Sequence, residues 1–166
     1  MNREINISTA GSRKTVKWKQ EKMLWYEFVD NLKIPNRSTE TLDEYMKLSK
    51  VRQDDLKDVG GFVAGSLRYG IRRNTNLMSR DLITLDLDNI VPGKTTEVLN
   101  NIKNLGVSYV AYSTRKHAEF KPRLRVIFLA DRAMSADEYE PVSRKLAEMI
   151  GIGMCDPTTF EPTRLM

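Results

Sequence analysis

Two aspartates stand one residue apart in a stretch that is typical of a β-strand. Residues 83–88 read Ile-Thr-Leu-Asp-Leu-Asp, so apolar and polar side chains alternate. Side chains of a strand alternate between its two faces, which predicts that Asp86 and Asp88 are neighbours on one face. Adjacent carboxylates repel each other unless a positive group lies between them. A pair of oxygen-liganded divalent cations is one candidate for that group, and a solvated polar loop beginning at Asp88 is the alternative.

A second set of residues that could take part in binding or catalysis is basic. It surrounds the connection between two predicted strands, 107–113 and 123–129. Arg123 and Arg125 share one face of the later strand because they are two positions apart. Arginine forms bidentate contacts with phosphate and lysine supplies a point charge, so the set suits a triphosphate. A solvated basic loop is the alternative, but it accounts less well for two arginines inside a strand. The set comprises Arg115, Lys116, His117, Lys121, Arg123 and Arg125.

Composition excludes several kinds of site. The chain has 166 residues, 40% apolar and 30% charged, which is typical of one globular domain with a substantial core. A single cysteine, Cys155, excludes an internal disulfide and a cysteine-rich zinc site, and the one histidine, His117, excludes sites built on paired histidines. Without a bilayer-length apolar run or a signal region, we expect a cytoplasmic protein. The net charge of +5 is compatible with a polyanionic partner.

The elements that must position these residues follow from apolar periodicity and capping signals. A helix-rich N-terminal part, residues 1–56, is expected to precede a core, residues 57–166, in the order β–β–α–β–β–α. This order predicts an α+β fold with a mixed or antiparallel sheet packed by helices. Residues 50–57 are expected to be a solvated end or loop. Thr41 with Glu44 and Ser135 with Glu138 have the form of capping boxes, and Thr95 or Thr96 is expected to cap a further helix. Tyr139 lies on the expected apolar side of the helix at 135–150. Strands are expected at 4–8, 60–67, 79–89, 107–113 and 123–129. Helices are expected at 21–32, from residue 38 onward, from the capping threonine to about residue 105, and at 135–150.

Two further basic segments have more than one interpretation. Trp18 lies among arginines and lysines in residues 2–20, and an exposed aromatic in such surroundings can stack on a single-stranded base. We favour a buried anchor for Trp18. Arg72 and Arg73 could contact phosphates, but a basic loop is the favoured interpretation.

Residues 57–166 resemble the catalytic domain of archaeo-eukaryotic primases, and most closely the N-terminal primase-polymerase domain of phage and prophage replication proteins of the virulence-associated E and primase-helicase group. The resemblance rests on segments in the family's order: Gly60–Gly65, then Leu85-Asp86-Leu87-Asp88, then Ser113–His117 with Lys121–Arg125, and finally Asp156–Met166. One departure is that His117 follows Ser113 by four residues, where the family has Ser-x-His.

The resemblance implies an RRM-like palm and template-directed primer synthesis or extension on single-stranded DNA. It implies that Asp86, Asp88 and Asp156 hold two Mg²⁺ or Mn²⁺ ions, with Glu161 as the alternative third acid. It adds Ser113 to the residues expected to bind nucleoside triphosphates and implies a helicase domain as partner. Because residues 164–166 read as the start of a strand, we expect a chain truncated at its C-terminus. A metal-dependent nuclease and a non-catalytic module that binds single-stranded nucleic acid are the alternatives.

Overall fold

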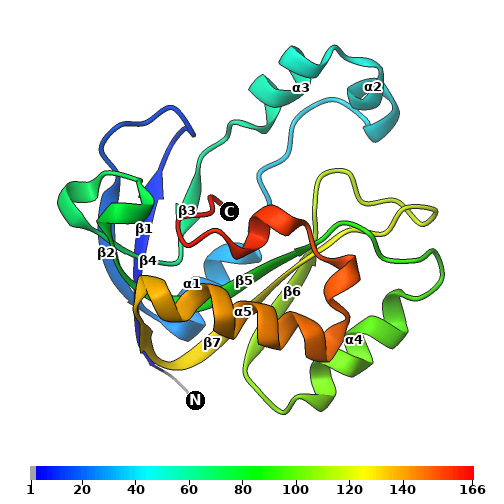
Figure 1. Ribbon diagram of the computed structural model, residues 1–166. Helices are drawn as coiled ribbons and strands as arrows, with labels where there is room; N and C mark the ends of the chain where they lie inside the picture. The colour runs from blue at the N-terminus through cyan, green and yellow to red at the C-terminus, as the bar shows by residue number, and fades with distance from the viewer. Residues whose placement is uncertain (1–2) are drawn as a thin grey trace.

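Two antiparallel sheets form the centre of the molecule, and the computed structural model describes residues 3–166 (Figure 1). One sheet has the strand order β2-β1-β3, and the other has the order β4-β5-β7-β6. The strands are β1 (Glu4–Ala10), β2 (Lys19–Leu24), β3 (Gly61–Val63), β4 (Gly65–Leu67), β5 (Leu77–Leu87), β6 (Tyr109–Ser113) and β7 (Leu124–Met134). The helices are α1 (Trp25–Leu32), α2 (Leu42–Lys47), α3 (Lys50–Lys57), α4 (Thr95–Asn104) and α5 (Ala136–Ile150).

The four-stranded sheet is covered on both faces, so most of β5 and the first half of β7 are buried. On one face, Leu85 of β5 packs with apolar residues of α4 and α5. On the other face, Leu82 packs with Ile7 of β1 and Phe28 of α1. The long pair β5 and β7 is therefore held between two hydrophobic layers, and this burial is the main stabilising contribution that fixes its position.

The two sheets are joined through a single residue. The chain leaves β3 at Val63 and enters β4 at Gly65, with Ala64 between them. The Ala64 carbonyl accepts a hydrogen bond from the Asp81 amide of β5 at 2.9 Å. Gly65 lies so close to β5 that a Cβ atom there would come within 1.8 Å of the Ser79 carbonyl oxygen. A glycine is therefore required where the backbone crosses from one sheet to the other.

Helices α2 and α3 form an arm, residues 33–60, that extends away from the sheets at the top of Figure 1. Thr41 caps α2 through a reciprocal capping box with Glu44, as the sequence predicts. The ring of Tyr45 is buried inside the arm and its hydroxyl donates to the Gln53 carbonyl at 3.2 Å. The arm thus has a small core of its own, and it reaches back toward the connection between β6 and β7.

Most expected elements are present, and the α+β class with antiparallel sheets is confirmed. Three local predictions were wrong. The helix expected at 21–32 begins only at Trp25, because residues 21–24 belong to strand β2, which pairs with β1 in the register Glu4 with Leu24. Residues 50–57 form helix α3, since Ser49 caps it by accepting a hydrogen bond from the Arg52 amide. Lys94 occupies the cap position of α4 without a side-chain hydrogen bond, so neither threonine caps it.

Candidate active site at the ends of strands β5 and β7

Asp86 lies at the C-terminal end of β5 and Asp88 directly follows the strand, and each is paired with an arginine near the start of β7: Arg125 within the strand and Arg123 just before it. The register places Asp86 directly opposite Arg125. Arg125 donates through Nε to Asp86 Oδ1 at 2.7 Å and through Nη2 to Oδ2 at 3.2 Å. Arg123 donates through Nη1 to Asp88 Oδ2 at 2.6 Å. The alternation of the two strands thus sets two acids against two arginines.

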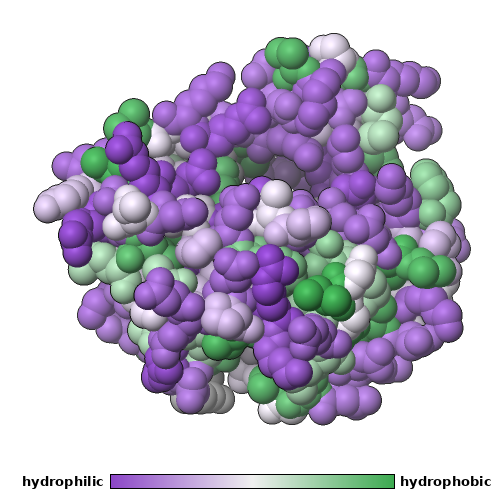
Figure 2. All heavy atoms as spheres, in the orientation of Figure 1, coloured by the Kyte–Doolittle hydropathy of each residue, from purple (hydrophilic) through white to green (hydrophobic). Residues whose placement is uncertain are grey.

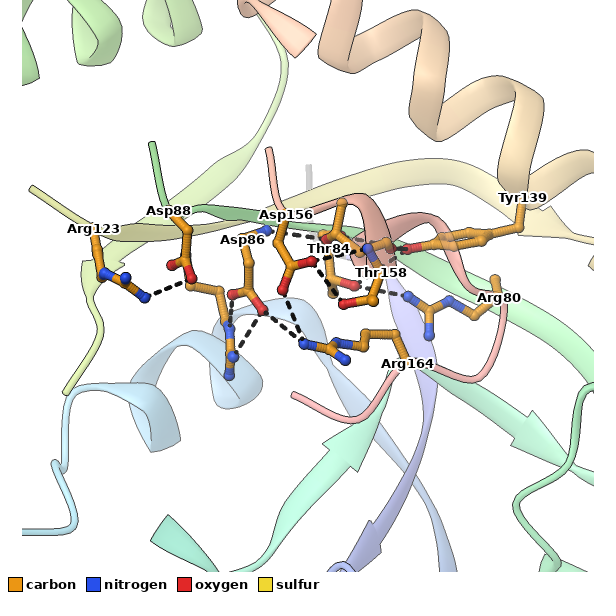
Figure 3. Close-up of polar contacts among 11 residues, drawn as sticks. Arg80, Thr84, Asp86, Asp88, Arg123, Tyr139, Asp156, Thr158 and Arg164 are labelled. Carbon is orange, nitrogen blue, oxygen red and sulfur yellow. Dashed lines mark hydrogen bonds and ion pairs between the residues drawn. The ribbon is translucent and has the colours of Figure 1, made fainter. Parts of the chain in front are cut away.

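Asp156 is brought to the same place by backbone pairing. Its amide donates to the Asp86 carbonyl at 2.8 Å, and the amide of Asp88 donates to the Met154 carbonyl at 3.0 Å. Cys155 forms an isolated antiparallel bridge with Leu87. Figure 3 shows the three carboxylates in a row on one side of the β5 ribbon. The segment after α5 therefore acts as a short additional partner for the end of β5.

Arg164 approaches two of these carboxylates at once. Its Nη2 lies 3.3 Å from Asp156 Oδ2 and 4.0 Å from Asp86 Oδ2. A single guanidinium therefore bridges acids from two segments. Arg164 had no signal of its own in the sequence, because nothing in a C-terminal Thr-Arg-Leu-Met run indicates that it returns to the end of β5.

A buried hydroxyl network holds the Asp156 segment against β5. Thr159 Oγ1 donates to the Thr84 carbonyl at 2.8 Å and accepts from the Asp86 amide at 3.0 Å. Tyr139 of α5 approaches the Thr84 hydroxyl at 3.3 Å and donates to the Thr159 carbonyl at 3.3 Å. Thr159 and Tyr139 are fully buried. Sequence analysis placed Tyr139 only in an apolar helix face, and its polar role was missed.

Arg80 lies behind this network and is fully buried. Its Nη2 donates to Thr84 Oγ1 at 2.9 Å, and its guanidinium lies 4.1 Å from the centre of the Tyr139 ring. Within residues 3–166, its Nε and Nη1 atoms have no hydrogen-bond partner. Burial lowers the pKa of Arg80 from its ordinary value, because a charged group loses hydration there.

The charge of Asp86 favours the protonated form of Arg125. Burial by itself would lower the pKa of Arg125, but the charge of Asp86 and a further contribution from Tyr112 outweigh burial and raise it. Burial also raises the pKa of the Tyr112 hydroxyl, against the opposing effect of Arg125. The Asp86 side chain is 8% exposed, whereas the Asp88 side chain is 31% exposed. Asp88 is therefore the acid more accessible to a ligand.

The predicted nucleotide-binding residues divide into two groups. His117 lies against the backbone of Arg123, the residue that pairs with Asp88. Its Nδ1 accepts from the Arg123 amide at 3.1 Å and lies 3.0 Å from the Arg123 carbonyl oxygen. Arg115 and Lys116 face the arm. The Arg115 guanidinium lies 4.4 Å from the centre of the Tyr45 ring and donates to Ser38, and Lys116 Nζ donates to Gln53 Oε1 at 2.8 Å.

A hollow of about 440 Å³ lies between the arm and the start of the β6–β7 connection, lined by Ser113, Arg115, Arg37 and Lys57 among others. Figure 2 shows a hollow beneath the arm with largely hydrophilic surroundings. The pKa of Lys57 is lowered by burial first and then by the charge of Lys116, while Asp88 acts in the opposite direction. The hollow is thus electropositive and lies within the electrostatic influence of the acids.

The donor set at the end of β5 consists of carboxylates, which are the ligands that Mg²⁺ and Mn²⁺ prefer. Within residues 3–166, however, no group of three or more His, Cys, Asp or Glu side chains is arranged to hold a metal ion. The reason is visible in the ion pairs: arginines occupy the positions next to each acid, and Arg164 stands between Asp86 and Asp156. A divalent cation fits this donor set chemically if it replaces these guanidinium groups. The alternative third acid, Glu161, is exposed on the turn before Arg164.

The chain belongs to the VapE N-terminal domain family, whose model matches residues 1–166. A solved structure to which this chain is similar is the AEP domain of the primase-polymerase of cyanophage S-2L, with 12% sequence identity and a TM-score of 0.47. That match covers 97% of this chain and 70% of the phage domain. No curated protein matches the sequence. In residues 3–166, no helix is both long and apolar enough to cross a membrane.

Proposed function

We propose that this domain is a primase-polymerase that joins nucleotides on a single-stranded DNA template, in the replication of a phage or mobile element. The observation that carries the proposal is the backbone pairing of Asp156 with Asp86, which gathers three acids from two distant segments beside Arg123 and Arg125. The order of motifs described above, from the glycine-rich strand to the final acidic segment, supports the same chemistry. Family membership is consistent with it.

Asp86, Asp88 and Asp156 would hold the divalent cations, either Mg²⁺ or Mn²⁺. When bound, such ions activate the primer 3′-hydroxyl and neutralise charge on the leaving pyrophosphate. The protein would need no nucleophile of its own, because positioning and charge perform the catalysis. Asp156 is held in place for this role by its own turn, where Oδ1 accepts from the Thr158 amide and hydroxyl, both at 2.9 Å.

The arginines that now pair with the acids are the natural ligands for the incoming triphosphate. If cations take over the carboxylates, Arg123, Arg125 and Arg164 are released as guanidinium groups that match phosphate oxygens in a bidentate manner. His117 lies next to Arg123 and would contact the same phosphates. Arg115 and Ser113, which line the hollow beneath the arm, would bind the nucleotide there, and Lys116, the residue after Arg115, would bind it from beside the hollow. The positive charge of the added cations is offset by the negative charge of the added triphosphate, so binding changes the net charge of the region little.

Primer extension with an Asp88→Asn variant tests this function. The assay uses a labelled primer on a single-stranded DNA template, nucleoside triphosphates and Mn²⁺. Asp88 is the best position because its ion pair is partly exposed, so its loss perturbs the fold less than the loss of Asp86. We expect wild type to extend the primer and Asp88→Asn to be at least about a hundredfold slower, since metal-assisted charge stabilisation is worth several kcal/mol.

Asp131→Asn is the matched control, because Asp131 is an exposed aspartate in the distal half of β7. It should extend primers at the wild-type rate. Equal extension by Asp88→Asn and wild type, with both folded by circular dichroism, would refute the assignment of the acids. Cleavage of labelled DNA in the absence of nucleotides would instead identify a metal-dependent nuclease.

One observation favours a second candidate, a non-catalytic module that binds single-stranded nucleic acid. In the described part of the chain each acid is already paired with an arginine, and no three-residue metal cluster is formed. For such a module, DNA affinity would be the same with Mg²⁺ and with a chelator, and titration calorimetry with a nucleoside triphosphate and Mn²⁺ would give no heat. The primase-polymerase instead requires nucleotide binding that depends on the metal.

We further propose a helicase domain as the partner of this primase-polymerase and the bacterial cytoplasm as its location.

A further inference from the structure

A basic surface lies on the side of the molecule where the β1–β2 loop meets the connection between β4 and β5. We call it the Tyr69 patch. Figure 2 shows hydrophilic residues gathered at the upper left, where Figure 1 places these two loops. Its residues are all exposed: Arg13, Lys14, Lys17, Arg68, Tyr69, Arg72 and Arg73.

The two loops are joined by backbone contacts around Trp18. The Trp18 amide donates to the Gly70 carbonyl at 2.7 Å. Gly70 has φ of 66°, and a Cβ atom there would lie 2.6 Å from the Trp18 carbonyl oxygen. The Trp18 ring is 3% exposed, so it is a buried anchor, as the sequence analysis favoured, and not a stacking surface. The guanidinium of Arg72 lies 5.6 Å from the centre of that ring. The patch is therefore an assembled surface and not two independent loops.

Tyr69 is the aromatic residue that this assembly exposes. Its side chain is 74% exposed. It also has φ of 60°, and among the described residues it is the one non-glycine residue with a positive φ. A left-handed backbone is unfavourable for an L-residue with a Cβ atom, and such outliers cluster at functional sites. A large ring kept in water on an unfavourable backbone contributes little to folding, which indicates that it serves a ligand.

The charges around Tyr69 are largely free for a ligand. Among residues 3–166, Arg13 pairs with Asp58 at 4.0 Å, but Lys14, Lys17, Arg68 and Arg73 form no ion pair. Unpaired basic side chains around an exposed aromatic ring suit a polyanion that also offers flat bases. Single-stranded nucleic acid has both features, because its bases are free to stack while its phosphates contact lysine and arginine.

The patch is connected to the candidate active site through the C-terminal segment. Arg72 Nη1 donates to the Thr163 carbonyl at 3.3 Å. The next residue, Arg164, bridges Asp156 and Asp86. The C-terminal segment is thus contacted by Arg72 of the patch one residue before the arginine that meets the acids.

We propose that the Tyr69 patch is a binding site for single-stranded nucleic acid, in which one base stacks on Tyr69 while the flanking phosphates contact Arg73, Arg68 and Lys14. The assignment of this strand to the template rests on the proposed function, whereas the binding itself does not. On the proposed function, the bound strand would run toward Asp86 and Asp156 past Arg72 and Arg164.

A Tyr69→Gly variant tests the inference, because glycine removes the ring and accepts the φ of 60° without strain. Binding is measured by fluorescence anisotropy with a labelled 20-nucleotide oligo-dT, in a chelator and without nucleotides. We expect Kd to rise about tenfold, since one base–aromatic stack is worth about that factor or more. The midpoint of thermal unfolding should be equal to or higher than that of wild type, so that misfolding cannot explain the loss. An unchanged Kd would overturn the proposal.

Four further measurements sharpen the result. Tyr69→Phe keeps the ring and should bind like wild type, and Tyr26→Ala removes a tyrosine that is 50% exposed on α1 and should also bind like wild type. Arg73→Gln should lower the slope of log K against log salt by about 0.7, the value for one phosphate contact to a single strand. An equal effect of Tyr69→Gly on duplex DNA would contradict stacking, because paired bases do not present a free face.

The outcomes for this patch and for the proposed function are separable. If Tyr69→Gly weakens oligo-dT binding but wild type extends no primer, the patch stands and the primase-polymerase assignment fails. If primer extension depends on Asp88 but oligo-dT binding does not depend on Tyr69, the reverse holds.

Discussion

The amide of Asp156 donates a hydrogen bond to the carbonyl of Asp86 at 2.8 Å, although β6, β7 and α5 separate the two residues in the sequence. This contact decides the layout of the candidate active site. It sets the third acid beside the first through the backbone, so that their separation does not depend on flexible side chains. The bridge between Leu87 and Cys155 continues the same pairing.

Thr159 should be essential for this pairing. In Thr159→Val, the buried Asp86 amide loses its acceptor, and an unsatisfied buried donor costs about 1–3 kcal/mol. We expect a loss of that size in the free energy of unfolding measured with urea, together with loss of primer extension. Thr159→Ser keeps the hydroxyl and should restore most of the stability. Equal stability of Thr159→Val and wild type would show that the network does not hold the segment.

Removal of Asp86 and removal of Asp88 should differ in their effects on stability. Asp86→Ala leaves the largely buried Arg125 without its partner, which is expected to cost about 3–5 kcal/mol. Asp88→Ala breaks a pair that water screens more, and should cost less than about 1 kcal/mol. Urea denaturation of both variants measures the difference. An Asp86→Ala, Arg125→Leu double variant should recover part of the loss, and no recovery would contradict this explanation.

Arg115 should control the opening of the arm. In Arg115→Gln, the contacts of its guanidinium with the Tyr45 ring and Ser38 are lost. We expect faster amide hydrogen exchange in α2 and α3, with unchanged exchange in β5 and β7. Lys145→Gln removes an exposed charge on α5 and is the control. Faster exchange throughout the molecule would indicate general destabilisation and would count against a specific tether.

Glu138 provides a pH-dependent contribution at the start of α5. Hydrogen bonds from Arg132 and then from the Ser135 amide lower the pKa of Glu138 to about 2. Because the folded-state pKa lies below that of the unfolded chain, its stabilisation is present above the unfolded value, about 4.3, and is lost as pH falls toward 2. Carboxyl ¹³C titration by NMR should show a low pKa in wild type and a higher one in Arg132→Gln. The same low value in both would exclude Arg132 as the main cause.

Local patterns in the sequence were sufficient for much of the fold. The alternation of residues 83–88 predicted the strand and the shared face of Asp86 and Asp88, and two capping boxes marked the starts of α2 and α5. These signals involve residues close together in the chain, so they can be recognised without knowledge of the tertiary structure. Strand β2 was missed because its stability comes from pairing with β1, which its own residues do not reveal.

The candidate site was predictable only in its parts. The spacing of Arg123 and Arg125 placed them on one face, but the register that sets Arg125 opposite Asp86, and so brings Arg123 to Asp88, depends on how β5 and β7 meet. The return of Arg164 and the buried position of Arg80 depend on the packing of the whole chain, so no local pattern indicates them. The binding roles assigned to His117, Lys116 and Arg115 remain predictions.

The single-residue link at Ala64 constrains how this domain can vary. Side chains alternate with a period of two, so adding one residue between Val63 and Gly65 would reverse the faces of one strand relative to the other. It would also move the glycine that the Ser79 carbonyl requires. Natural insertions and deletions are therefore expected to avoid this crossing, and any relative sliding of the two sheets is prevented by the shortness of the chain between them.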